Sequence, residues 1–176
     1  RLRAGLVAED DLAGVPFATA LQQAGIVPGI KVDAGSKALA GFPGEEVTEG
    51  LDGLRERLAA YAGMGARFAK WRAVIRIGDG TPTAGGLFAN AHALARYAAL
   101  CQAAGLVPIV EPEVLMDGGH DLQRCREVTE ETLHVVLAQL HAQRVRLEGM
   151  LLKPNMVLPG KDCADQSDTV SIAAAT

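Results

Sequence analysis

Four short apolar runs at nearly equal spacing constrain the fold of this chain more than any other feature of its sequence. They span residues 25–32, 68–75, 106–111 and 149–153. Near-continuous hydrophobicity over such short lengths is typical of strands that are covered on both faces, as in parallel sheets. We therefore interpret the runs as four buried strands, of which the second is the least apolar.

Segments with helical periodicity separate these runs. Apolar residues recur at the spacing of a helix face over residues 48–61, 84–104 and 121–143. Thr48 is the predicted N-cap of the first helix, and Gly105 is the predicted C-cap glycine of the second. Strands that alternate with helices favour parallel pairing, in a doubly wound sheet or a (β/α)8 barrel. A complete barrel has about 250 residues and eight strands, so four strands would form half of it.

The composition narrows the classes of function. A net charge of −4 gives no electrostatic reason to expect nucleic acid or an anionic membrane as partner. No apolar stretch approaches the roughly 20 residues of a membrane span, and the acidic residues that soon follow the N-terminus make it a poor signal peptide. The three cysteines are widely spaced, which favours reduced thiols in a cytoplasmic protein.

Motifs for cofactors and metals are missing from the sequence. It contains no glycine-rich dinucleotide motif and no P-loop, which lowers the nucleotide-binding options. The four histidines form no metal-binding array, and we expect each of them to be a surface or cap residue. We therefore predict neither a metal site nor a bound cofactor.

Ionisable residues lie within the apolar runs, mostly towards their C-terminal ends. These residues are Lys31, Lys70, Glu111 and Lys153. In parallel α/β folds ligands bind at this end of the strands, and in barrels it carries the active site. Because residues i and i+2 of a strand share a face, Arg72 is predicted to point the same way as Lys70, and Glu113 the same way as Glu111.

Each of these residues also has a purely structural interpretation. Lys31 could be a rim lysine that reaches to water, and Arg72 could pair with a structural carboxylate. Glu113 could serve only to orient a neighbouring group or to pair with a lysine. A buried ionisable group needs a partner or a purpose, and this favours function for Lys70, Glu111 and Lys153.

These residue types suit the chemistry of a Schiff base. A lysine attacks a ketone only as the neutral amine, which burial and a neighbouring ammonium both favour. Lys153 is predicted to have both, since it ends an apolar strand and Lys70 is expected nearby. Formation of the imine also needs a group that gives and takes protons, and Glu111 is suited to this role. The remaining cations, Lys31 and Arg72, could hold a phosphate.

At these residues the sequence resembles class I fructose-bisphosphate aldolases. The resemblance rests on residues 29–33, 48–54, 68–72, 94–98, 107–113 and 148–157. Each segment alone is weak, but the combination is specific and extends from about Val15 to Asp168. The family folds as a (β/α)8 barrel, which implies that this chain is an α/β fold with about strands three to six and their helices.

The resemblance implies a role for each candidate residue. Lys153 matches the family's Schiff-base lysine, Glu111 its proton-transferring carboxylate, and Lys70 the lysine beside the imine. Lys31 and Arg72 match cationic positions near the 6-phosphate of the sugar, and Glu113 matches a carboxylate that supports the imine site. These three residues are the predicted substrate-binding set.

The implied activity is the cleavage of fructose 1,6-bisphosphate to dihydroxyacetone phosphate and glyceraldehyde 3-phosphate in glycolysis. The family acts on a small-molecule sugar phosphate, works without metal and usually assembles as a homotetramer. The resemblance implies the same three properties here. Two alternatives stay open at this point. The chain could be a catalytically inactive segment of such an enzyme, or part of a lysine-imine aldolase for another sugar phosphate.

The part of the family's barrel that this chain resembles determines the domain that we expect. The family's first two strands, with an aspartate that handles the 4-hydroxyl proton, have no counterpart here. Neither do strands seven and eight, which grip the 1-phosphate, nor the C-terminal tail with its tyrosine. Residues 1–176 are therefore predicted to form one incomplete barrel domain, truncated at both ends. The isolated chain is predicted to be unstable, to aggregate or to self-associate. Residues 171–176 are predicted to open the sixth helix.

Overall fold

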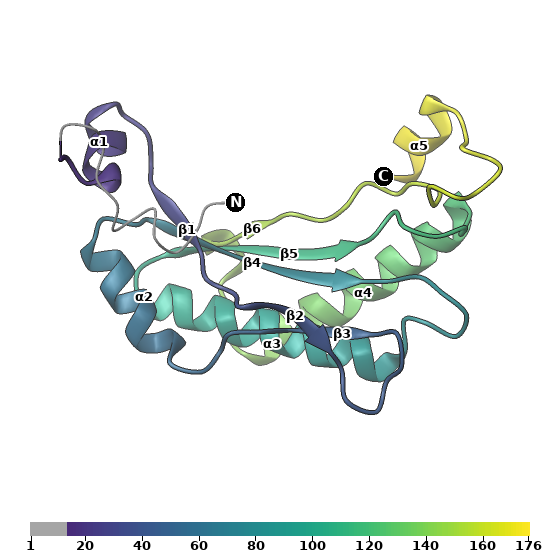
Figure 1. Ribbon diagram of the computed structural model, residues 1–176, viewed down its shortest axis with the longest axis horizontal. Helices are drawn as coiled ribbons and strands as arrows, with labels where there is room; N and C mark the ends of the chain where they lie inside the picture. Colours follow the sequence, from purple (N-terminus) through teal and green to yellow (C-terminus); the bar gives the residue numbers. More distant parts are fainter. Residues whose placement is uncertain (1–13) are drawn as a thin grey trace.

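A four-stranded parallel sheet forms the centre of the computed structural model, which describes residues 14–176 (Figure 1). The strands lie in the order β1 (Gly29–Lys31), β4 (Phe68–Ile75), β5 (Val107–Val114) and β6 (Leu151–Leu152). All four predicted strands are present. The second has the predicted bounds, the first and last are shorter, and the third extends further. The parallel pairing confirms the expectation from the alternating strand and helix patterns.

Three helices follow the strands in the expected places. They are α2 (Leu54–Gly63), α3 (Ala84–Ala103) and α4 (Leu122–Ala142). The hydroxyl of Thr83 caps α3, and the carboxylate of Asp121 caps α4, each accepting a hydrogen bond from a backbone N–H of the first turn. Gly105, with φ of 72°, follows α3 in the left-handed conformation that suits glycine, as predicted.

The predicted N-cap at Thr48 is wrong. Thr48 lies in β3 (Glu46–Glu49), which pairs antiparallel with β2 (Gly35–Ala38) in a hairpin. Helix α2 begins only at Leu54, after Gly53. The hairpin was missed because its short, polar strands carry no apolar run. Contacts with distant elements fix them instead: the backbone N–H of Thr48 donates to Asn90 Oδ1 of α3 at 3.2 Å.

Three further elements complete the fold. They are α1 (Phe17–Gln23), a 3-10 turn at Leu147–Gly149, and α5 (Thr169–Ala175). Helix α5 lies where the sixth helix was predicted to open, whereas α1 was not predicted. In Figure 1 these two short helices project at opposite ends of the sheet. No helix of the described residues is long and apolar enough to cross a membrane.

The two faces of the sheet have different surroundings. On β4, alternate residues Ala69, Trp71, Ala73 and Ile75 are buried, while the residues between them are only half-buried. Helices α3 and α4 pack on the buried face, and Tyr97 of α3 donates its hydroxyl to the carbonyl of Ala69 at 2.6 Å. Among residues 14–176 no helix covers the other face (Figure 1). The expectation that both faces are covered is therefore not met in the described chain.

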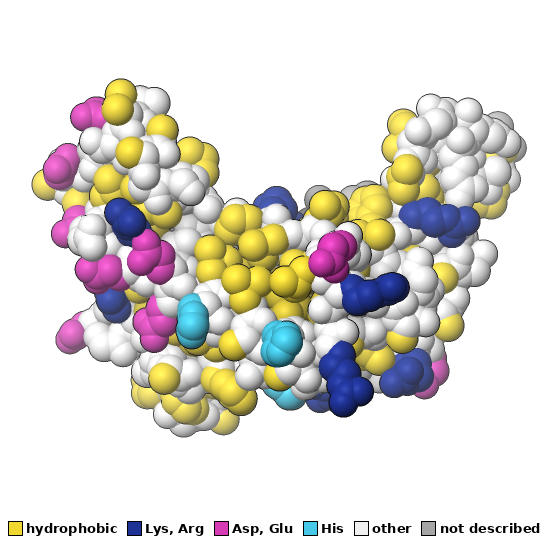
Figure 2. All heavy atoms as spheres, turned by 180° about the vertical axis from the view of Figure 1, so that it is seen from behind, with side chains coloured by type: hydrophobic (Ala, Val, Ile, Leu, Met, Phe, Trp, Pro, Cys, Tyr) yellow, Lys and Arg dark blue, Asp and Glu magenta, His cyan; other side chains and the backbone are white. Residues whose placement is uncertain are grey.

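Apolar side chains are exposed on the open side of the molecule. Figure 2 shows a hydrophobic patch in the hollow between its two projecting ends. The strand at one edge of the sheet contributes exposed apolar residues, because Leu151 is 56% and Leu152 is 39% accessible. The open face and the exposed edge strand both leave apolar surface in contact with water.

Candidate active site

Strand register brings the predicted ionisable residues onto the open face. Lys31 of β1 is in register with Lys70 of β4, and Arg72 of β4 is in register with Glu111 of β5. Lys153 follows β6 directly, and its backbone N–H donates to Val110 of β5 at 2.8 Å. Parallel pairing thus places residues that lie far apart in the sequence side by side on neighbouring strands.

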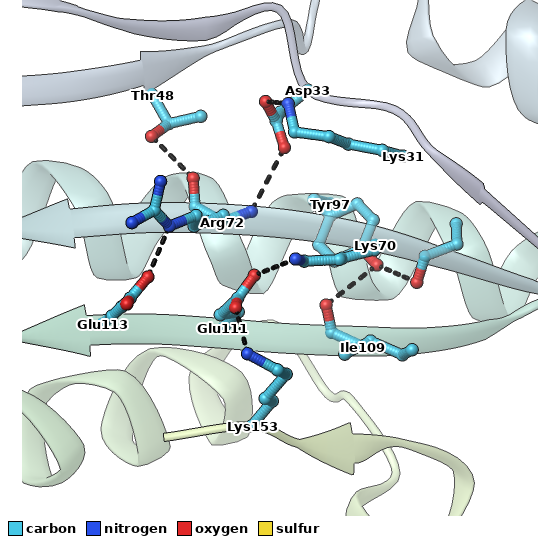
Figure 3. Close-up of polar contacts among 11 residues, drawn as sticks. Lys31, Asp33, Thr48, Lys70, Arg72, Tyr97, Ile109, Glu111, Glu113 and Lys153 are labelled. Atoms are coloured by element: carbon cyan, nitrogen blue, oxygen red, sulfur yellow. Dashed lines mark hydrogen bonds and ion pairs between the residues drawn. The ribbon is translucent and has the colours of Figure 1, made fainter. Parts of the chain in front are cut away.

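Glu111 lies between two lysines (Figure 3). Its Oε2 is 2.7 Å from Nζ of Lys70, and its Oε1 accepts a hydrogen bond from Nζ of Lys153. The carboxylate is buried, with a side-chain accessibility of 3%. A buried carboxylate is stable only when it is paired, and here two ammonium groups provide the pairing.

The two lysines set the protonation state of Glu111. Burial alone would raise its pKa, but the hydrogen bonds and charges of Lys153 and Lys70 outweigh burial and hold the pKa below its usual value. Glu111 is therefore ionised at neutral pH. An ionised carboxylate in contact with an ammonium is placed to accept a proton from it.

A second ion pair lies further along the same two strands. The guanidinium of Arg72 donates to Oε2 of Glu113, and both side chains are partly exposed. This hydrogen bond, together with nearby carboxylates, outweighs burial and raises the pKa of Arg72. The predicted pairs on β4 and β5 therefore share the open face, as the i, i+2 spacing indicated.

Asp33 belongs to the same cluster, although sequence reasoning did not select it. Its carboxylate accepts from the ammonium of Lys31, from the backbone N–H of Gly35 at 3.1 Å and from that of Arg72 at 3.2 Å. Its side chain is 1% accessible. Its position two residues after Lys31, just beyond a strand, is the sequence signal that could have identified it.

The expected burial of Lys153 is not found. Its side chain is 58% accessible, because β6 lies at the edge of the sheet and residues 14–176 place no strand beyond it. The neighbouring ammonium that was predicted for it is present, since Lys70 contacts the same carboxylate.

Two hollows flank the cluster. One, of about 780 Å³, opens beside Lys31 and Asp33, between the hairpin and helices α2 and α3. The other, of about 340 Å³, lies beyond the C-terminal ends of β5 and β6 and is lined by Arg72, Glu113 and Asn155, among others. The second hollow lies at the strand ends where ligands bind in parallel α/β folds.

The histidines and cysteines add no metal ligands. Residues 14–176 contain no group of three His, Cys, Asp or Glu side chains placed to hold a metal ion. The three cysteines are free thiols. Contrary to expectation, His120 is buried, and neither ring nitrogen has a hydrogen-bond partner. The loop before α4 is covered by residues 160–162, and local sequence patterns could not reveal that contact.

Comparison with known proteins gives one consistent result. The family model described as Glycolytic, fructose-bisphosphate aldolase class-I, matches residues 6–176. A probable fructose-bisphosphate aldolase class 1 of Xanthomonas campestris is 60% identical over 163 residues, which are 93% of this chain and 49% of that protein. Fructose-bisphosphate aldolase C of Rattus norvegicus is 54% identical over 168 residues, which are 96% of this chain and 46% of that protein.

A solved structure agrees with both. Fructose-bisphosphate aldolase of Plasmodium falciparum, crystallised with TRAP and a small-molecule inhibitor, superposes with a TM-score of 0.94 at 44% identity. The match covers 97% of this chain and 50% of that one. This likeness confirms the predicted α/β fold as part of a (β/α)8 barrel. The chain spans about half the length of the relatives that it matches.

Proposed function

Because this chain belongs to the class I fructose-bisphosphate aldolase family, we propose that the protein containing it cleaves fructose 1,6-bisphosphate to dihydroxyacetone phosphate and glyceraldehyde 3-phosphate. The observation that carries the proposal is the contact of one buried carboxylate, Glu111, with two lysines, Lys70 and Lys153. This arrangement supplies the nucleophile and the proton carrier that imine chemistry requires.

The imine forms in two steps, formation of a carbinolamine and then its dehydration. Glu111 accepts a proton from the Lys153 ammonium, and the neutral Nζ then attacks the C2 ketone to give a carbinolamine. The protonated Glu111 returns its proton to the C2 hydroxyl, which leaves as water while the protonated imine forms. The hydrogen bond between the two side chains is the geometry that this exchange needs.

Carbon–carbon cleavage follows from the positive charge of the imine. A base removes the proton of the 4-hydroxyl, whose oxygen becomes the aldehyde carbonyl as the C3–C4 bond breaks. The electron pair of that bond forms the C2=C3 bond of an enamine, and the π pair of the imine moves onto its nitrogen. Lys70 beside the imine provides positive charge where the substrate is held. Lys31 and Arg72 bind the distal phosphate, and Glu113 orients Arg72 through their ion pair.

The setting of the activity is part of the same proposal. The protein acts in glycolysis in the cytoplasm, assembles as a homotetramer, and uses neither nucleic acid nor a metal. Chelation with EDTA is expected to leave cleavage unchanged. Loss of activity after chelation would replace the imine mechanism with metal chemistry.

Borohydride trapping tests the proposal. With dihydroxyacetone phosphate present, reduction of the complete gene product should attach the ketone to Lys153, and mass spectrometry should locate the adduct there. Lys153→Arg should abolish the adduct. Lys161→Arg is the matched control, because Lys161 is exposed and pairs with Asp117 outside the cluster. An absence of adduct on the unaltered protein would overturn the proposal.

A further inference from the structure

We propose that Asp33 is a positioning residue whose buried carboxylate fixes the Lys31 ammonium on the open face and ties it to the Arg72 peptide. The two cations then form one pre-arranged anion-binding pair. The inference rests on the proposed function, because it takes the anion to be the distal phosphate of the sugar substrate.

The backbone shows why a carboxylate is needed at this point. Pairing of β1 with β4 ends at Lys31 and Lys70, and the N–H of Val32 donates to the carbonyl of Lys70 at 3.0 Å. Beyond this contact the chain of β1 leaves the sheet. The next peptide groups of β4 on that side would lack strand partners, which is costly for a sheet backbone.

Two side chains replace the missing strand. The N–H of Arg72 donates to Oδ2 of Asp33 at 3.2 Å, and the carbonyl of Arg72 accepts from the hydroxyl of Thr48 at 2.8 Å. Figure 3 shows both bonds, which run from the same edge of β4 at Arg72 to Thr48 and Asp33. The Arg72 peptide is therefore held by one charged and one neutral side chain, and the two can be removed separately.

The second carboxylate oxygen of Asp33 has a different task. Oδ1 accepts from the ammonium of Lys31 and from the N–H of Gly35 at 3.1 Å. A neutral amide has a single acceptor oxygen, so it could accept from only one of the two backbone N–H groups, and it carries no charge to pair with the ammonium. Since Asp33 is almost fully buried and Lys31 is partly exposed, the acid anchors the flexible lysine and leaves part of it open to solvent.

Both cations of the pair are thus oriented by a carboxylate of their own. Arg72 is held at its guanidinium by Glu113 and at its peptide by Asp33, which also holds Lys31. A single buried side chain therefore contacts both the ammonium of Lys31 and the backbone of Arg72. Such pre-arrangement lowers the ordering cost when a phosphate binds.

Binding measured without turnover tests the inference. In the complete gene product carrying Lys153→Arg, calorimetric titration with fructose 1,6-bisphosphate gives Kd directly. Adding Asp33→Asn should weaken binding about tenfold, as expected for the loss of one charge-assisted contact. The matched control is Thr48→Val, which removes the other side-chain bond to the Arg72 backbone. Because Lys31 stays paired in this variant, Kd should change by no more than about twofold. A tenfold change would require about 1.4 kcal/mol.

A double-mutant cycle separates positioning from general damage. If Asp33 acts through Lys31, then Asp33→Asn should add little to the effect of Lys31→Met on Kd. Fructose 1-phosphate, which lacks the distal phosphate, should bind equally well with and without Asp33→Asn. Additive effects, an equal loss for the monophosphate, or an equal loss in Thr48→Val would each overturn the positioning role.

The outcomes also distinguish the two proposals. Borohydride trapping at Lys153 in the unaltered protein, combined with an unchanged Kd in Asp33→Asn, would defeat the positioning role alone. No trapping and no binding of the bisphosphate would defeat the proposed function and the positioning role together.

Discussion

At the scale of single residues, the site is organised by which carboxylate faces which cation. Glu111 contacts Lys70 and Lys153, and Asp33 contacts Lys31. The more exposed ion pair of Arg72 and Glu113 lies further along the strands. Buried acids are costly unless paired, so these partners determine both the stability of the cluster and the charge that it presents.

Glu111→Gln tests the proton carrier. An amide cannot take a proton from Lys153 or return it to the carbinolamine, so kcat for cleavage by the complete gene product should fall about 10²–10⁴-fold. Stopped-flow measurement of imine formation should show the same loss. Retention of more than about a tenth of the rate would assign proton transfer to another group.

The lowered pKa of Glu111 also predicts how stability depends on pH. Because its folded pKa lies below the ordinary value of 4.5, the unfolded chain binds the proton more readily. The stabilisation is fully present above about pH 4.5 and is lost as the pH falls through the folded pKa. The difference in unfolding free energy between the unaltered protein and Glu111→Gln should therefore shrink as the pH is lowered below 4.5.

Urea denaturation at a series of pH values measures this difference. Glu130→Gln is the control, because Glu130 is exposed on α4 and its ion pair is with Arg126 of the same helix. The measurements run from pH 6 to pH 3, about 1.5 units either side of 4.5, so that they bracket the protonation of Glu111. If the difference in unfolding free energy between Glu111→Gln and the unaltered protein stays constant over this range, the predicted pH dependence is wrong.

At the scale of elements, the β2–β3 hairpin is held by the first turns of α3. The carboxylate of Glu45 accepts from the backbone N–H of Thr83 at 2.9 Å and from its hydroxyl at 2.6 Å. Asn90 also bonds to the hairpin through Glu46 and Thr48. An acidic side chain at a helix N-terminus is favourable, so α3 fixes the hairpin and the hairpin brings Thr48 to β4.

Gly86→Ala should loosen this contact. A Cβ on Gly86 would lie 2.1 Å from Oε1 of Glu45, and the buried carboxylate can move only by giving up its bonds to Thr83. We expect a loss of about 1–3 kcal/mol in unfolding free energy. Gly63→Ala on α2 is the control: a Cβ there meets nothing within 4 Å, and it should stabilise by about 0.4–1 kcal/mol. Equal effects of the two substitutions would contradict the proposed contact.

For the molecule taken together, the sheet formed by residues 14–176 has one face covered by helices of that range and one face without such cover, and β6 forms an exposed edge. Exposed strands with apolar side chains template pairing with other chains. Residues 1–176 expressed alone should therefore self-associate, and Leu151→Lys, which puts a charge on the exposed edge, should reduce that association. Sedimentation velocity at several concentrations measures both. A monomer with a sharp thermal transition would count against the prediction.

Local patterns in the sequence predicted the alternating strands and helices, and also the ionisable residues at the strand ends. Both follow from periodicity and local polarity, which a single segment carries. The hairpin, the burial of His120 and the contacts of Asp33 are visible in the tertiary structure alone, because they depend on partners distant in the sequence. The exposure of Lys153 depends on its edge position in the sheet, which no local pattern encodes. Register then turned separate charges into one cluster, since pairing decides which side chains meet.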